Sequence, residues 1–173
     1  AKVTSNLSVR DPAPHPAAQT GDEHYLASQA QVKVAVTQKN DAEIPTAIEA
    51  LIAPGSLAQD QLPNFYLNLA KTRYNLKQYP QSIAALEKTL QLEPNNQEAT
   101  TLLAHARSAG GNPTDAVAAL QKSIIQQSAN GAKAPEDLYK RAIQLAYKAK
   151  LASTPEISRQ WVVAYPSPGN WRD

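Results

Sequence analysis

Residues 63–96 read PNFYLNLAKTRYNLKQYPQSIAALEKTLQLEPNN, and residues 97–130 read QEATTLLAHARSAGGNPTDAVAALQKSIIQQSAN. The two stretches are equally long and align without a gap. A third stretch of the same length, residues 135–168, follows after the short insertion 131–134. A fixed period of this length predicts a repeat array, in which each unit is one supersecondary element stacked on its neighbours.

Side chains of constant size recur within this unit, which we number with Pro63 as position 1. Positions 8 and 20 are small in every unit: Ala70, Ala104 and Ala142, then Ser82, Ala116 and Thr154. Positions 7 and 24 are leucine in the first two units, whereas the third unit has Arg141 and Ser158. Because small residues let two helix backbones approach closely, each unit is predicted to be a pair of antiparallel helices.

Prolines and glycines mark where these helices begin and end. In the first unit one helix is predicted over residues 64–76, and a second from about Pro80 to just before Pro94. In the second unit, residues 110–113 (GGNP) break the pair. In the third, Thr154 is predicted to cap the second helix, ahead of a first-turn proline.

The pattern of the first unit resembles the tetratricopeptide repeat family. The residues that carry the resemblance are Tyr66, Leu69, Ala70, Tyr74, Tyr79, Ser82, Leu86 and Pro94. Departures are Arg73 and Arg107 at position 11, where the family often has Tyr, and Thr100 at position 4. The resemblance extends from Leu26 to the end of the chain, and it implies an all-α fold, an alpha-alpha superhelix of antiparallel helix pairs.

The flanks of the array are organised less regularly. Residues 1–21 are predicted to be an extended leader rich in Pro and Ala, and residues 22–62 a degenerate repeat and its connection, with a first helix over about 22–39. Residues 131–168 combine the insertion with the third repeat. Residues 169–173, with Trp171 near position 4, are expected to begin a further repeat, so the chain is expected to be part of a longer protein.

Composition argues against several classes of function. Lys plus Arg total 17 against 15 for Asp plus Glu, without a basic stripe, so we expect no nucleic-acid partner, including the RNA that some repeats of similar period bind. The chain has no Cys, and its three His lack metal-ligand spacing. No apolar run is long enough to insert into a membrane. No catalytic or nucleotide-binding motif is found, so we expect no enzyme, no cofactor and no metal.

The family resemblance implies that positions 2, 5, 9, 12 and 13 of the first helices line a concave groove. These partner-binding candidates are Asn64, Leu67, Lys71, Tyr74, Asn75, Glu98, Thr101, His105, Ser108, Glu136, Tyr139, Ile143 and Tyr147. Mixed aromatic, aliphatic and amide groups suit an extended or helical peptide. The Lys and Asn set with which some relatives clamp a C-terminal carboxylate is missing, because Leu67, Lys71 and Leu102 occupy its places.

The sequence therefore predicts a protein–protein interaction module that binds a peptide or protein in its groove, as a scaffold or adaptor. The alternative is a segment for self-assembly, in which residues 155–173 pair with a second copy to form a homo-oligomer. The leader, the missing Met and Cys and a likeness to periplasmic bacterial tetratricopeptide repeat proteins favour an exported, periplasmic protein, with the cytoplasm as the other compartment.

Overall fold

A computed structural model of the chain describes residues 21–38, 40–53 and 57–167. Over these residues the structure is helical and contains no strand, which confirms the predicted all-α class. The leader up to residue 20 and Trp171 lie outside the described residues. The helices are α1 (Gly21–Thr37), α2 (Ile44–Ile52), α3 (Leu62–Asn75), α4 (Tyr79–Leu92), α5 (Gln97–Ala109), α6 (Pro113–Gln127), α7 (Glu136–Lys148) and α8 (Thr154–Ala164), with a 3₁₀ turn at Ala129–Gly131.

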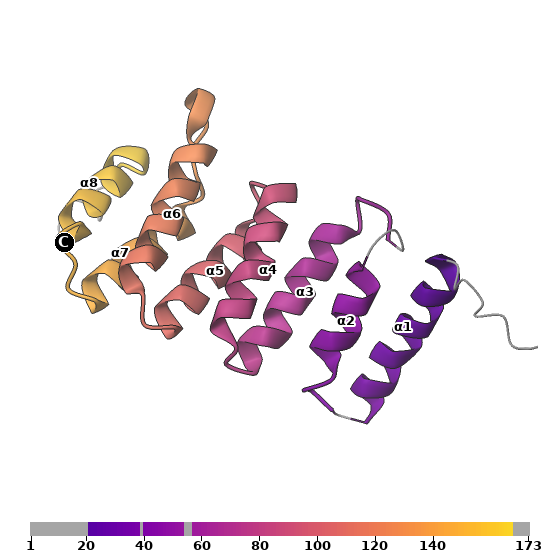
Figure 1. Ribbon diagram of the computed structural model, residues 1–173. Helices are drawn as coiled ribbons and strands as arrows, with labels where there is room; N and C mark the ends of the chain where they lie inside the picture. The colour runs from indigo at the N-terminus through magenta and orange to yellow at the C-terminus, as the bar shows by residue number, and fades with distance from the viewer. Residues whose placement is uncertain (1–20, 39, 54–56, 168–173) are drawn as a thin grey trace, which may run out of the picture.

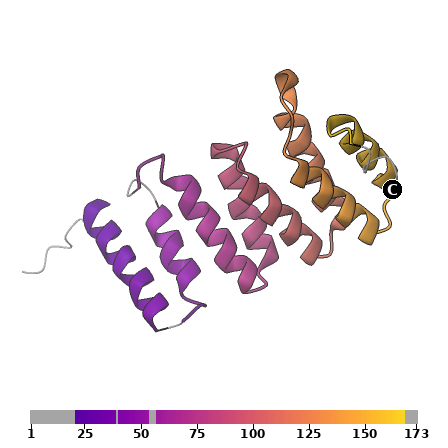
Figure 2. The same ribbon diagram turned by 180° about the vertical axis from the view of Figure 1, so that it is seen from behind.

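The helices lie side by side in chain order and form an elongated array (Figures 1 and 2). Each helix packs against the next one in the sequence, and α3 also touches α5. We call α1, α3, α5 and α7 the A helices, and α2, α4, α6 and α8 the B helices. No helix of the described residues is both long and apolar enough to cross a membrane.

Small residues lie where an A helix meets its B helix, as the repeat predicts. Ala70, Ala104 and Ala116 are at most 1% exposed. Ser82 is fully buried as well, and its hydroxyl donates a hydrogen bond of 2.8 Å to the Ala70 carbonyl across the helix pair. A buried hydroxyl needs such a partner, so this bond keeps the close approach of α3 and α4 favourable.

The turns between A and B helices share one hydrogen-bond pattern. The amides of Gln78, Asn112 and Leu151 each donate a bond of 2.9 Å to the carbonyl five residues earlier. The residue before each amide has positive φ, at 59° for Lys77, 92° for Gly111 and 54° for Lys150. This is the Schellman arrangement, which ends a helix by satisfying its last carbonyls.

The positive-φ residues reveal a register error in the third predicted unit. In the first two units the positive-φ residue, Lys77 or Gly111, occupies position 15. The predicted register puts Ala149 at position 15 of the third unit, but the residue with positive φ there is Lys150. Each α7 residue therefore corresponds to the α5 residue one place earlier than predicted. In this corrected register Ala142 replaces Leu103 in the core, and Arg141 falls on the more accessible place of Leu102.

The start of α8 differs from the prediction too. Ile157, rather than Ser158, is fully buried in the core. The turn before α8 is longer than in the first two units, because α4 and α6 begin two residues after the positive-φ residue and α8 begins four residues after Lys150. Ile157 is therefore the fourth residue of its helix, the place that Ser82 and Ala116 take in α4 and α6. Ser153 is the N-cap residue, and Thr154 does not cap the helix as predicted. Its hydroxyl instead donates to the carbonyl of Leu151, inside the turn, at 2.8 Å.

The two arginines at position 11 connect neighbouring repeats. Arg73 of α3 forms an ion pair of 2.6 Å with Glu49 of α2, and Arg107 of α5 forms one of 2.9 Å with Glu87 of α4. Both guanidinium groups are less exposed than their glutamate partners. Each pair joins an A helix to the B helix of the preceding unit. Tyr, which the family often has at position 11, carries no charge and could not form such an ion pair.

Enlarging a residue at the helix crossing tests this packing. Ala104→Leu is expected to lower the free energy of unfolding by about 1–3 kcal/mol, because no space exists for the added carbons. Truncation by Leu86→Ala should cost about 2–5 kcal/mol through a cavity. Ala118→Leu, at an exposed site of α6, is the matched control and should change stability by about 0.5 kcal/mol or less. Urea unfolding followed by circular dichroism measures all three, and an unchanged Ala104→Leu would contradict the packing.

Candidate functional site

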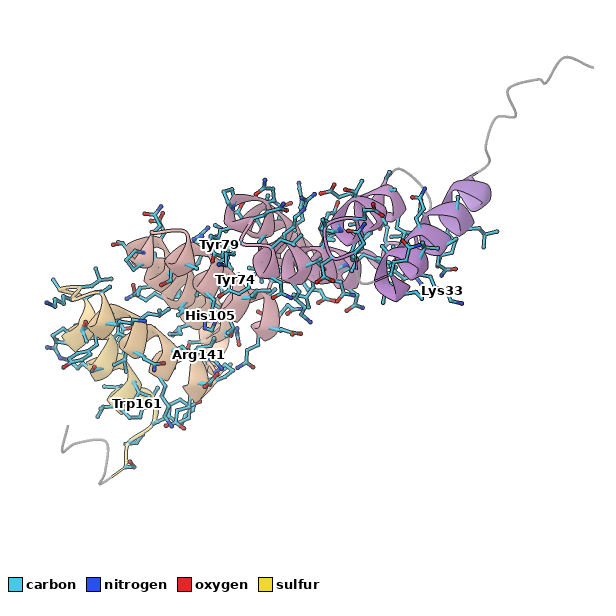
Figure 3. The ribbon with its side chains drawn as sticks, turned by 90° about the horizontal axis from the view of Figure 1, so that it is seen from below. Lys33, Tyr74, Tyr79, His105, Arg141 and Trp161 are labelled. Atoms are coloured by element: carbon cyan, nitrogen blue, oxygen red, sulfur yellow. The ribbon has the colours of Figure 1, made fainter. Side chains whose placement is uncertain are left out.

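Side chains from three A helices line one groove of about 680 Å³. The groove crosses α3, α5 and α7, so it spans consecutive repeats. Its lining residues are Lys71, Tyr74 and Asn75 from α3, Gln97, Glu98, Thr101, Leu102 and His105 from α5, and Asp137 and Arg141 from α7. Figure 3 shows Tyr74, His105 and Arg141 following one another along this side of the molecule. We refer to these ten residues as the A-helix groove.

Six of the predicted binding residues lie together in this groove. They are Lys71, Tyr74, Asn75, Glu98, Thr101 and His105. They come from the first two predicted units, whose register is predicted correctly. Ser108 and Asn64 lie outside the lining, although Asn64 is exposed.

The remaining predicted residues are placed differently. Leu67 is only 6% exposed because it packs in the core beside Leu69 and Ala70, so a partner can reach little of it. Tyr139 is 5% exposed and Ile143 is partly buried, both against the core around α7. Tyr147 is 77% exposed but lines a separate depression near the α7–α8 turn.

The register of α7 explains the placements of Tyr139 and Ile143. In the corrected register, Glu98 of α5 corresponds to Asp137 and Leu102 corresponds to Arg141, and all four residues line the groove. Asp137 was missed because α7 was aligned one residue too early. Arg141, like Gln97 and Leu102 of α5, lies at a repeat position that the predicted groove set does not include. The only sequence signal for the shift is the turn itself, where Lys150 takes the positive-φ place that glycine marks in the second unit.

Glu136, predicted to face a partner, instead connects α7 to α8. One carboxylate oxygen accepts hydrogen bonds from Trp161 Nε1 and Lys140 Nζ, both at 3.1 Å. The Lys140 ammonium also lies 5.7 Å from the centre of the Trp161 ring. The hydrogen bond from Lys140, more than the bond from Trp161, holds the pKa of Glu136 below its ordinary value, although desolvation opposes the shift.

Two ion pairs hold the charges of the groove. Lys71 Nζ lies 2.8 Å from Glu98 Oε1 and joins α3 to α5, whereas Arg141 Nε lies 2.5 Å from Asp137 Oδ2 within α7. These four side chains are between 37% and 61% exposed, so solvent screens both pairs and neither adds much stability. The pairs orient the charged groups along the groove walls.

His105 lies in the middle of the groove, and no described carboxylate forms an ion pair with it. Loss of hydration, and secondarily the positive charge of Arg141, lower the pKa of His105 below its ordinary value of 6.5. The imidazole is therefore neutral near pH 7 and can act as both donor and acceptor. Tyr74 and Leu102 supply apolar contact area beside it, so the groove offers apolar, amide and charged groups together.

The titration of His105 can be measured directly by NMR. We expect a pKa below that of a model histidine, and Arg141→Gln should raise it because one of its two causes is removed. Since the folded pKa is depressed, the folded state binds fewer protons than the unfolded chain. Stability therefore falls as pH drops through the unfolded value near 6.5 and approaches the folded pKa. Arg159→Gln, on the exposed side of α8, is the control and should leave the titration of His105 unchanged.

Comparison with known proteins supports the helical-repeat fold. Residues 74–132 match the family model described as tetratricopeptide repeat. The match runs from the end of α3 through α4, α5 and α6, so it includes the B helix of the first unit and the whole second unit. No curated protein matches the chain. The resemblance seen in the sequence is thus confirmed for residues 74–132, the part of the chain that matches the tetratricopeptide repeat model.

Proposed function

We propose that the chain binds an extended segment of a partner protein in the A-helix groove and acts as a scaffold or adaptor rather than as an enzyme. Tetratricopeptide repeats are a general protein–protein interaction module and are typically non-enzymatic. The observation that carries the proposal is the alignment of ten side chains from α3, α5 and α7 along one groove of about 680 Å³.

The chemistry of this groove suits a peptide. Tyr74 is half-buried against the core and held edge to face by Tyr79, with ring centres 5.6 Å apart, so it presents a fixed aromatic surface. Asn75, Gln97 and Thr101 add groups that can bond to a peptide backbone. A rigid aromatic surface flanked by such groups binds a chain with little loss of side-chain entropy.

The span of the groove favours a short extended segment. Neighbouring packed helices lie about 8–10 Å apart, so the path from α3 across α5 to α7 is about 20 Å long. An extended chain covers about 3.3 Å per residue, which sets the contact length at about six residues.

We also propose that the chain is part of a longer, exported bacterial protein of the periplasm. The Pro- and Ala-rich residues 1–21 and the absence of Cys support this setting.

A blocked groove tests the proposal. Peptides of about nine residues, long enough to cross the groove, are selected from a randomised display library on the 173-residue chain. Thr101→Arg places a large side chain in the middle of the groove and should weaken the selected peptides about tenfold or more. Thr114→Arg makes the same change at an exposed site of α6 and should have no effect. Equal affinities for the two variants, measured by fluorescence polarisation, would refute binding in this groove.

Self-assembly is the second candidate, because Val163 on α8 is 73% exposed at the end of the described array. If this surface joins two copies, light scattering should show a dimer that Val163→Ser returns to a monomer. Trp161 is not a suitable probe, since it holds α8 against α7 through Glu136. A monomer at all concentrations would remove this candidate.

A further inference from the structure

Arg141 has unused hydrogen-bonding groups that face the groove. Its Nε atom bonds to Asp137, but neither terminal nitrogen has a partner among the described residues. The two terminal nitrogens of a guanidinium group form a planar fork that matches the two oxygens of a carboxylate. Asp137 bonds only to Nε of Arg141, so the two terminal nitrogens are left to bind a ligand.

His105 is the second group with unused capacity. Its imidazole makes no hydrogen bond to any described residue and is exposed in the groove. The charged and titratable groups around it are Lys71 and Tyr74 on α3, Glu98 on its own helix, and Asp137 and Arg141 on α7. Both carboxylates already pair with a cation, Glu98 with Lys71 and Asp137 with Arg141.

The charges of the groove therefore balance only while His105 is neutral. Protonation of His105 would add a positive charge close to Arg141 with no carboxylate left to offset it, and the same arginine already opposes that protonation. An added carboxylate would remove this opposition, because it could accept from the Arg141 fork and from the imidazolium at once. A neutral ligand group could accept these hydrogen bonds but would not offset the added charge, and a cationic group could do neither.

Resting on the proposed peptide-binding function, we propose that the bound segment carries an aspartate or glutamate side chain that lies between Arg141 and His105, and that its binding adds a proton to His105. Arg141 supplies the recognition of the acidic group, and His105 makes this recognition depend on pH. The acidic group belongs to a residue within the segment, not to a chain end.

The direction of the pH effect follows from linkage. Nearby carboxylate charge raises the pKa of His105 in the complex, whereas the free groove keeps it low. The complex therefore binds more protons than the free chain, and affinity rises as pH falls. The window is about pH 7.5 to 5.5, since a peptide glutamate with a pKa of about 4.3 remains ionised there.

The test uses the tightest peptide from the library, amidated at its C-terminus so that its side chains provide the only carboxylates. We expect an acidic residue at one selected position, and its replacement by Gln or Asn should weaken binding about tenfold at pH near 5.5, the loss typical of a charged hydrogen bond. The unmodified peptide should bind about threefold to tenfold more tightly near pH 5.5 than near pH 7.5, as expected if the pKa of His105 rises by up to one unit.

Two variants separate the roles of the two residues. Arg141→Gln should lower the preference for the acidic peptide over its amide severalfold, whereas Arg159→Gln on α8 should keep it. His105→Gln should remove the pH dependence of the affinity. Circular dichroism melts establish that each variant is folded before it is compared.

The outcomes that would contradict the acidic-segment proposal differ from those that would contradict peptide binding in the groove. If peptides bind and Thr101→Arg blocks them, but acidic and amide peptides bind equally or Arg141→Gln keeps the preference, the acidic-segment proposal is overturned while groove binding stands. If a free C-terminal carboxylate can replace the side chain, the internal acidic residue is the wrong source. If Thr101→Arg has no effect on any peptide, the groove function fails first.

Discussion

Close approach of the two helices in each pair is the constraint on which the rest of the structure depends. At Ala70 and Ser82 the backbones of α3 and α4 come near enough for a side-chain hydroxyl to reach a carbonyl of the other helix. A pair this thin buries little apolar surface alone, so it must stack on its neighbours to form a core. Stacking places α3, α5 and α7 in sequence along one side, and a groove lined by all three A helices is the direct result.

Residues that look irregular in the repeat support the stacking. Arg73 and Arg107 depart from the aromatic residue usual at position 11, yet each forms an ion pair with a glutamate of the preceding B helix. Partly exposed ion pairs contribute about 0–1 kcal/mol each to the free energy of unfolding. Their main effect is therefore to fix how each A helix is oriented against the preceding B helix. In α7 the corresponding residue is Ala146, which is buried and uncharged, and α7 instead makes its polar contact with α8, through Glu136, Lys140 and Trp161.

The sequence predicts the helices well because small residues, leucines and prolines recur at a fixed period, and local turn chemistry reinforces that period. It predicts six groove residues for the same reason. The third unit fails where the period breaks, since an insertion hides the register and Lys150 adopts a positive φ that only glycine would indicate. A shift of one residue turns a helix by about 100°, which is why Tyr139 and Ile143 were expected in the groove but lie against the core, while Asp137 was missed. Arg141 lies at position 6, as Leu102 does, and that position was not among those expected to line the groove.

The corrected register also changes the chemistry of the groove. With Tyr139 and Ile143 as lining, the α7 wall would be aromatic and aliphatic and would favour apolar partners. With Asp137 and Arg141 the α7 wall is charged. Arg141 bonds to Asp137 through Nε, so its two terminal nitrogens remain as hydrogen-bond donors for a ligand in the groove. The ion pairs leave the groove nearly neutral, so its long-range attraction for a charged peptide is weak. Discrimination between peptides must therefore come from direct contacts in the groove. The proposed selectivity for an acidic side chain thus depends on two donors from different repeats, Arg141 on α7 and His105 on α5, which stacking of the units places in one groove.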